Sequence, residues 1–182
     1  MAAGRSTWIV LAGLVAAALS VQAQGDTVQG LLTIGSAKVP MTKVSLSAGM
    51  AVAYKAPNGP LISVVLCDKP VDAKAFAEDT AVGAGEPLVS GTFQGAWKSQ
   101  HFAKKIAGVT FTIGPDGLTD DEFLVNGRNG TFSLGGDAYV LTVKSRSPRL
   151  VGTIKTKAPT VELGEDRNAG LDAMFDLAVT TR

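Results

Sequence analysis

Histidine and cysteine are almost absent from this chain of 182 residues, which contains one of each. A single histidine, His101, excludes the HExxH zinc motif and metal centres built from several histidines. The sequence also has no G-x-S-x-G elbow, no S-x-x-K motif and no GxxxxGK[ST] phosphate loop. The run 83–88 begins like a dinucleotide loop, but Leu88 replaces the third glycine and Pro87 disfavours a helix start. No cofactor and no metal are therefore expected.

The lone cysteine, Cys67, excludes an intramolecular disulfide. It ends the apolar run 61–67, which favours a buried, reduced thiol that packs as a small hydrophobe. The alternative is an intermolecular bridge or a reactive thiol. Only Lys69 among its near neighbours in sequence would lower the thiol pKa.

What the chain does have is a leader with the three parts of a secretory signal peptide. Arg5 gives a positive start, residues 8–19 are apolar, and Val21–Ala23 is a small-x-small cleavage site. The apolar run is shorter than the roughly 20 residues that span a bilayer. We expect residues 1–23 to be removed and the protein to be exported to the periplasm or the extracellular space. No cysteine directly follows the cleavage point to carry a lipid anchor, and the alanine-rich leader favours a bacterial source.

Neither sign of charge is in excess. Loss of Arg5 with the leader leaves 16 Lys+Arg (17 − 1) against 16 Asp+Glu, a formal charge of zero. A neutral chain with interspersed signs has no electrostatic footprint for nucleic acid or for an anionic membrane. Residues 24–182 contain no transmembrane run and suit a single exported domain that is large enough to bury a core.

Alternating apolar and polar residues indicate that this domain consists of strands. The period of two is typical of half-buried strands and recurs in four segments, 28–34, 109–113, 139–144 and 173–180. The run 61–67 lacks alternation and predicts a central strand that is covered on both faces.

Turn signals separate these segments. Residues that tolerate positive φ occur as the pairs Asn58-Gly59, Asp116-Gly117, Asn126-Gly127, Asn129-Gly130 and Gly135-Gly136. Asp116-Gly117 predicts a hairpin, and Pro40 suits an edge strand or a bulge. Asp72 is placed to cap a short helix over 73–78, followed by a loop over 80–87. The expected fold is all-β, an antiparallel β-sandwich or flattened β-barrel with one short helix.

The candidate binding residues are Trp97, Lys98 and His101. They lie in the segment 97–105, which gathers the only Trp beyond the leader, the only His, Phe102 and three lysines. As a loop, this segment would offer an aromatic platform and a cationic rim to a sugar or an anionic group. The alternative, which base rates favour, is a loop or strand edge whose aromatics cover the core and whose lysines keep the edge soluble.

Two further segments carry weaker signals. The acidic segment 116–122 could offer oxygen ligands to Ca²⁺, but it lacks EF-hand spacing, and a solvated turn is favoured. The sequon 129–131 matters only in a eukaryotic secretory pathway and is interpreted as turn chemistry.

The order of segments resembles a group of small exported bacterial β-rich proteins of unassigned activity. The resemblance rests on the runs 30–44, 61–71, 150–154 and 175–179. These motifs are structural, and Cys67 stands where that group leads us to expect Thr. The resemblance carries no catalytic residue to this chain.

Two classes of function remain. The first is a non-enzymatic exported module that binds a partner protein, a glycan or another small molecule. The second is a secreted hydrolase that uses an Asp/Glu pair, because a glycosidase needs only two carboxylates about 5–10 Å apart. A cleft with two such carboxylates would favour the hydrolase.

Overall fold

The computed structural model describes residues 25–36, 39–79, 90–124, 133–162 and 168–182. The expected signal peptide, the loop 80–87 and the sequon lie outside these ranges. The described chain is mostly β. Its elements are β1 (Thr27–Ser36), β2 (Val39–Leu46), β3 (Ala48–Ala56), β4 (Gly59–Cys67), α1 (Ala73–Asp79), α2 (Ser90–Lys104), β5 (Gly108–Gly114), β6 (Gly117–Leu124), the 3₁₀ turn η1 (Gly136–Ala138), β7 (Tyr139–Ser145), β8 (Arg149–Thr156), β9 (Val161–Glu162) and β10 (Asn168–Thr181). Neither described α-helix is long and apolar enough to cross a membrane.

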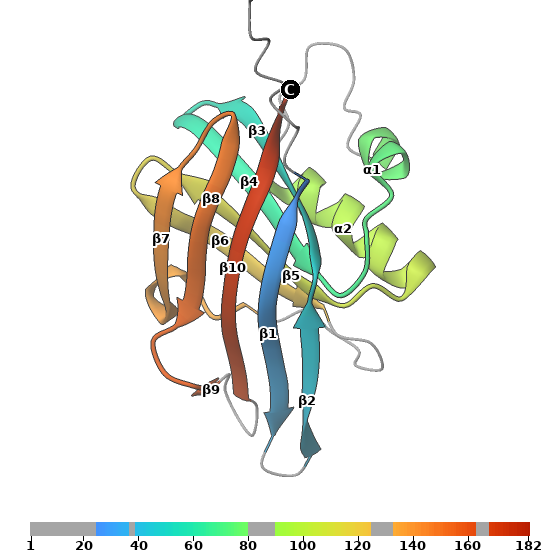
Figure 1. Ribbon diagram of the computed structural model, residues 1–182, viewed down its shortest axis with the longest axis vertical. Helices are drawn as coiled ribbons and strands as arrows, with labels where there is room; N and C mark the ends of the chain where they lie inside the picture. Colours follow the sequence, from blue (N-terminus) through green and yellow to red (C-terminus); the bar gives the residue numbers. More distant parts are fainter. Residues whose placement is uncertain (1–24, 37–38, 80–89, 125–132, 163–167) are drawn as a thin grey trace, which may run out of the picture.

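The strands join into one sheet that curls into a half-barrel (Figure 1). One path runs β2-β1-β10-β3-β4-β5-β6, and β8 and β7 branch from the other edge of β10. We call β2, β1, β10, β8 and β7 the open half, and β3, β4, β5 and β6 the covered half. Both helices lie on the outer face of the covered half.

β10 connects the two halves. Its first part pairs antiparallel with β1, ending with Asp176 opposite Thr27, and with β8 on its other side. Beyond Asp176 the edge that β1 occupied is free, and Val179 there pairs in parallel with Ala51 of β3. The expectation of an antiparallel arrangement therefore holds for the other described pairs but not for this one.

The main core lies between the inner faces of the two halves. The strand pattern of β10 is confirmed, because Phe175 and Leu177 are buried on the inner face while Met174 and Ala178 are exposed. The ring of Phe175 lies 6.0 Å from that of Phe111 on β5. Apolar side chains from both halves thus share one interior.

A second core lies between the covered half and the helices. Because of this layer, β4 is buried on both faces, as its lack of alternation predicted. The expectation that β5 is half-buried is wrong. The helix layer also covers Thr110 and Thr112, so β5 is buried on both faces. Helix α1 matches the predicted short helix, and the Asp72 carboxylate caps it by accepting from the backbone N–H of Lys74 and Ala75.

Several turn predictions are also confirmed. Gly59 and Gly117 have φ of 117° and 130°, in the region that favours glycine, and each opens the second strand of a hairpin. Pro40 lies in β2, an edge strand among those described, next to a shift in register between Ile34 and Ser36. Sequence therefore placed these two tight turns and this edge correctly, whereas the predicted pairs at 126–127 and 129–130 lie outside the described residues.

Candidate binding surfaces

The predicted site residues Trp97, Lys98 and His101 lie on α2, not on a loop or strand edge. The side chains of Trp97 and His101 point inward and are 0% and 6% exposed, whereas Lys98 is partly buried. The buried positions on α2 are 93, 96, 97, 100 and 101, a spacing of three to four that marks one face of a helix. That spacing was present in the sequence and could have predicted α2.

His101 and Trp97 are packed differently within the helix layer. Nδ1 of His101 lies 2.6 Å from the Ile106 carbonyl oxygen. A carbonyl only accepts, so Nδ1 carries the proton and donates it, which fixes the chain as it leaves α2. The indole Nε1 of Trp97 is buried with no hydrogen-bond partner among the described residues. Both rings serve as packing groups in this arrangement, and the exposed aromatic of the segment is Phe102.

A row of polar side chains crosses the covered half beneath α2. The Tyr54 hydroxyl lies 2.9 Å from Ser63 Oγ, which lies 2.8 Å from Thr112 Oγ1. On the next strand, Asp120 accepts a hydrogen bond of 2.5 Å from Gln94 Nε2 of α2. Burial raises the pKa of the Asp120 carboxyl above its ordinary value. The row anchors α2 to the sheet.

The neighbouring residue Asp121 faces the main core, so the segment 116–122 is not a solvated turn throughout. The Asp121 carboxylate accepts hydrogen bonds from Ser133 Oγ (2.7 Å), Leu134 N (2.8 Å), Gly135 N (3.0 Å) and the Tyr139 hydroxyl (2.6 Å). Burial, together with the Asp121 charge, raises the pKa of Tyr139. Asp120 and Asp121 are neighbours on β6, so their side chains point to opposite faces of the strand. The described residues contain no group of three metal-ligating side chains. Asp121 instead ties β6 to the start of β7.

The outer face of the open half carries most of the exposed large apolar side chains among the described residues. Leu31, Met41, Val140 and Met174 all lie there, and Met174 is 55% exposed. No described helix covers this face. It is an amphipathic surface on the sheet.

Three adjoining hollows follow β10 along this face, with volumes of about 370, 430 and 410 Å³. The first two share Gln29, Thr153 and Met174, and the last two share Leu31 and Asp172. Together they form one groove from Asp176 to Gly170, which is about 20 Å of extended strand. We call this the β10 groove.

Lysines border the β10 groove. Lys144 lines its first hollow, and Lys155 and Lys157 line its last. The carboxylates that line the groove are Asp172 and Asp176, and Asp176 is paired with Arg149. No ion pair links these three lysines to another described residue. The rim is therefore positively charged.

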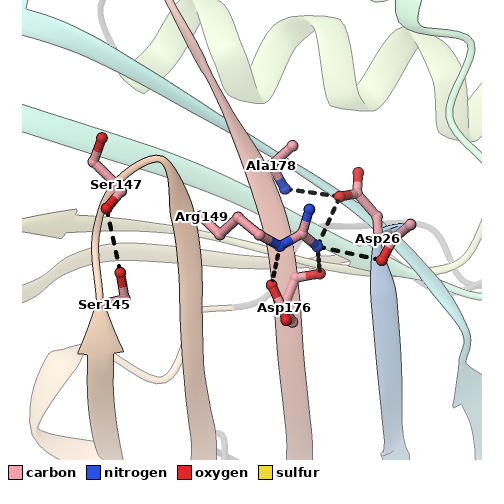
Figure 2. A network of polar contacts seen from close by, with 7 residues as sticks. Asp26, Ser145, Ser147, Arg149, Asp176 and Ala178 are labelled. Carbon is pink, nitrogen blue, oxygen red and sulfur yellow. Dashed lines mark hydrogen bonds and ion pairs between the residues drawn. The ribbon is translucent and has the colours of Figure 1, made fainter. Parts of the chain in front are cut away.

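An ionic cluster lies beside the first end of the groove, where Asp176 lines the first hollow. Figure 2 shows the hydrogen bonds and ion pairs of this cluster. Arg149 Nε donates to the Asp176 carboxylate, and Arg149 Nη2 lies 3.3 Å from Asp26 Oδ1 and 2.8 Å from the Asp176 carbonyl oxygen. Asp26 Oδ1 also accepts from the N–H of Ala178 at 2.7 Å. Asp26 thus occupies the point where β1 leaves β10 and β3 begins to pair with it.

Comparison with protein-family models, with curated proteins and with solved structures gave no match. Function must therefore be argued from these surfaces.

Proposed function

We propose that the protein is an exported binding module that holds an extended, acidic peptide segment of a partner protein in the β10 groove. The observation that carries this proposal is the groove itself. It combines an apolar floor at Met174 and Leu31, polar flanks at Gln29 and Thr153, and a lysine rim, on the face that no described helix covers.

The dimensions and lining favour a peptide over the other ligands of this class. About 20 Å accommodates roughly six residues of extended chain. The side chains of Gln29, Thr27 and Thr153 offer donors and acceptors to backbone amides. Sugars are usually held on aromatic faces, and the only aromatic that lines the three hollows, Phe175, points its ring into the core. The lysine rim selects acidic side chains.

The hydrolase alternative receives less support. The carboxylates that come together at the groove are Asp26 and Asp176, and Arg149 joins both of them. A glycosidase needs one carboxyl that holds a proton for the leaving group. The Arg149 guanidinium holds both carboxylates by ion pairs, and Asp26 also accepts from the N–H of Ala178, so neither carboxyl is directed toward a ligand in the groove.

The peptide proposal is tested by selection from a random library of short displayed peptides. Sequences rich in Asp, Glu and aliphatic residues should be enriched. Met174→Glu should weaken binding of a selected peptide at least about tenfold, because it places a charge on the apolar floor. Lys155→Glu should weaken it in a salt-dependent way.

Lys55→Glu, an exposed position on β3 outside the groove, is the matched control and should leave peptide binding unchanged. Two results would overturn the proposal. The first is an equal loss of peptide binding in Lys55→Glu and Lys155→Glu, and the second is that Met174→Glu still binds the selected peptides. A hydrolase screen whose activity disappears in Asp26→Asn and Asp176→Asn would replace it with the enzyme.

Export itself rests on the leader. We propose that residues 1–23 are cleaved and that the protein works in the periplasm or outside the cell. Intact-mass measurement of the exported protein should give a chain that begins at Gln24. A mature mass that includes residues 1–23 would refute cleavage.

For the architecture, we propose that the halves are the two layers of a flattened barrel in which the described residues of β6 and β7 form no backbone ladder with each other. The shared core and the contact from Tyr139 to Asp121 between these two strands support it. Solution exchange of backbone amides should protect β4 and β10 most strongly. Rapid exchange throughout either strand would contradict a two-layered barrel.

A further inference from the structure

The end of α2 exposes a large aromatic side chain beside a group of lysines. Phe102 is 74% exposed, more than any other large hydrophobic residue in the described part of the chain. The neighbouring His101 is buried and lies edge-on to it, with ring centroids 5.1 Å apart. Phe102 therefore projects from a helix that is fixed to the sheet beneath it.

Four ammonium groups surround this end of the helix. Lys98, Lys104 and Lys105 belong to α2 or follow it directly. Lys69 is brought there from the end of β4, where its Nζ donates to the Lys105 carbonyl at 3.1 Å. The nearby described carboxylates are Asp72, which pairs with Lys104 at 2.7 Å, and Asp68, which accepts from Ala107 N. Among the described residues here, four lysines stand beside two carboxylates, whereas the predicted exported chain is neutral. Lys98 and Lys105 also interact with other groups of the protein.

We propose that this surface, the α2 patch of Phe102, Lys69, Lys98, Lys104 and Lys105, docks on an anionic lipid membrane. Phe102 enters the headgroup region, and the lysines meet lipid phosphates. A protein partner fits the patch less well, because a stable interface buries about 800 Å² on each side. One aromatic ring with a cationic rim is small for that purpose but suits reversible binding to a lipid surface.

The position of the patch is compatible with the peptide groove. The helices lie on the outer face of the covered half (Figure 1). The residues that line the β10 groove lie on the outer face of the open half. Docking through the helices leaves the groove directed away from the lipid. The two sites are therefore independent, and each can fail in experiment without the other.

The test is sedimentation of the purified exported protein with vesicles of phosphatidylglycerol and phosphatidylcholine in equal parts. Vesicles of phosphatidylcholine alone serve as the comparison. We expect binding to the anionic vesicles only, lost at high salt because screening weakens it. Phe102→Ser should weaken binding about tenfold, and Phe102→Leu should retain most of it. Lys98→Glu should weaken binding by roughly tenfold through charge reversal.

Met41→Ser and Lys55→Glu remove comparable groups from exposed positions outside the patch and should leave sedimentation unchanged. The fluorescence of buried Trp97 reports that each variant is folded. Three results would each overturn the proposal: no binding to anionic vesicles, equal binding to both kinds of vesicle, or losses in Phe102→Ser and Lys98→Glu no larger than those in the two controls.

Discussion

The outer faces of β4 and β10 have the same strand geometry but different surroundings. On the covered half, α2 and α1 bury Trp97, Phe93 and Phe76 against the sheet, and the polar row is hydrogen-bonded beneath them. On the open half, Met174 and Leu31 remain exposed in a groove with a charged rim. The comparison teaches that apolar residues on the outer face of the covered half are buried in a second core, whereas those on the outer face of the open half remain exposed.

The largest expected effect comes from the covered half. Trp97→Ala should lower the free energy of unfolding by about 3–5 kcal/mol, because it removes a buried aromatic and leaves a cavity. Met174→Ala, on the open half, should change it by no more than about 0.5 kcal/mol. Urea denaturation of both variants measures the difference, and similar values for the two would break the comparison.

Trp97→Phe sharpens this prediction. Phenylalanine is smaller but lacks the indole N–H that has no described partner. An unsatisfied buried donor costs about 1–3 kcal/mol, so its removal should offset part of the lost packing. Trp97→Phe should therefore cost much less than Trp97→Ala. A loss as large as that of the alanine variant would show that the N–H is satisfied in solution.

The next largest expected effect on stability comes from the contact between Asp121 and Tyr139, which joins the two halves. Asp121→Ala leaves the Tyr139 hydroxyl, Ser133 Oγ and the Leu134 N–H without this acceptor, and leaves the Gly135 N–H with Ser133 Oγ alone. We expect a loss of about 3 kcal/mol in the free energy of unfolding. Tyr139→Phe removes one donor and should cost about 1 kcal/mol. Thermal or urea unfolding checks both, and a near-neutral Asp121→Ala would mean that β6 and β7 are not coupled in this way.

The reactivity of Cys67 tests whether β4 is buried within the covered half. The expected loss of stability is smaller here than in Trp97→Ala or Asp121→Ala. Burial raises the pKa of the Cys67 thiol to about 12, so the reactive thiolate is scarce at neutral pH. A thiol reagent should label the native protein very slowly and the urea-unfolded protein rapidly. Cys67→Ala should cost on the order of 1 kcal/mol through lost packing. Rapid native labelling would contradict the described position of β4.

The smallest expected effect is a dependence of folding stability on pH through Asp120. The folded-state pKa of Asp120 is raised by burial, so the native state holds its proton more tightly than the unfolded chain. Stability from this group is present below the unfolded pKa and is lost as pH rises through the folded pKa. Asp120→Asn keeps an acceptor for Gln94 and should be slightly more stable at neutral pH, with no gain at low pH. Melting temperatures at the two pH values measure this, and an equal gain at both would refute the burial argument.

Much of the strand architecture was predictable because it is encoded locally. The apolar run before Cys67 indicated a central strand, and Asp116-Gly117 indicated the hairpin of β5 and β6. The alternation of β5 was misinterpreted for a physical reason. Thr110 and Thr112 alternate like solvent-facing residues, but α2 covers them, and their hydroxyls are satisfied within the protein.

The candidate surfaces were less predictable, because they depend on contacts between distant residues. Arg149 and Asp26 meet only after β8 and β1 have both taken their places beside β10. No local pattern marks the β10 groove, since its lining comes from several strands. Trp97 was singled out by its residue type, which indicates importance but does not distinguish a ligand platform from a packed helix face.

The position of β10 in the chain has a consequence for the order of folding. β10 follows every other described element, yet it pairs with β1, β8 and β3 and forms the junction between the halves. Val28 finds its partner Phe175 only after almost the whole described chain is available. Such high contact order makes folding slow. A chain whose sheet waits for its last strand stays unfolded for longer after synthesis, which is the condition that a translocation channel for unfolded polypeptides requires.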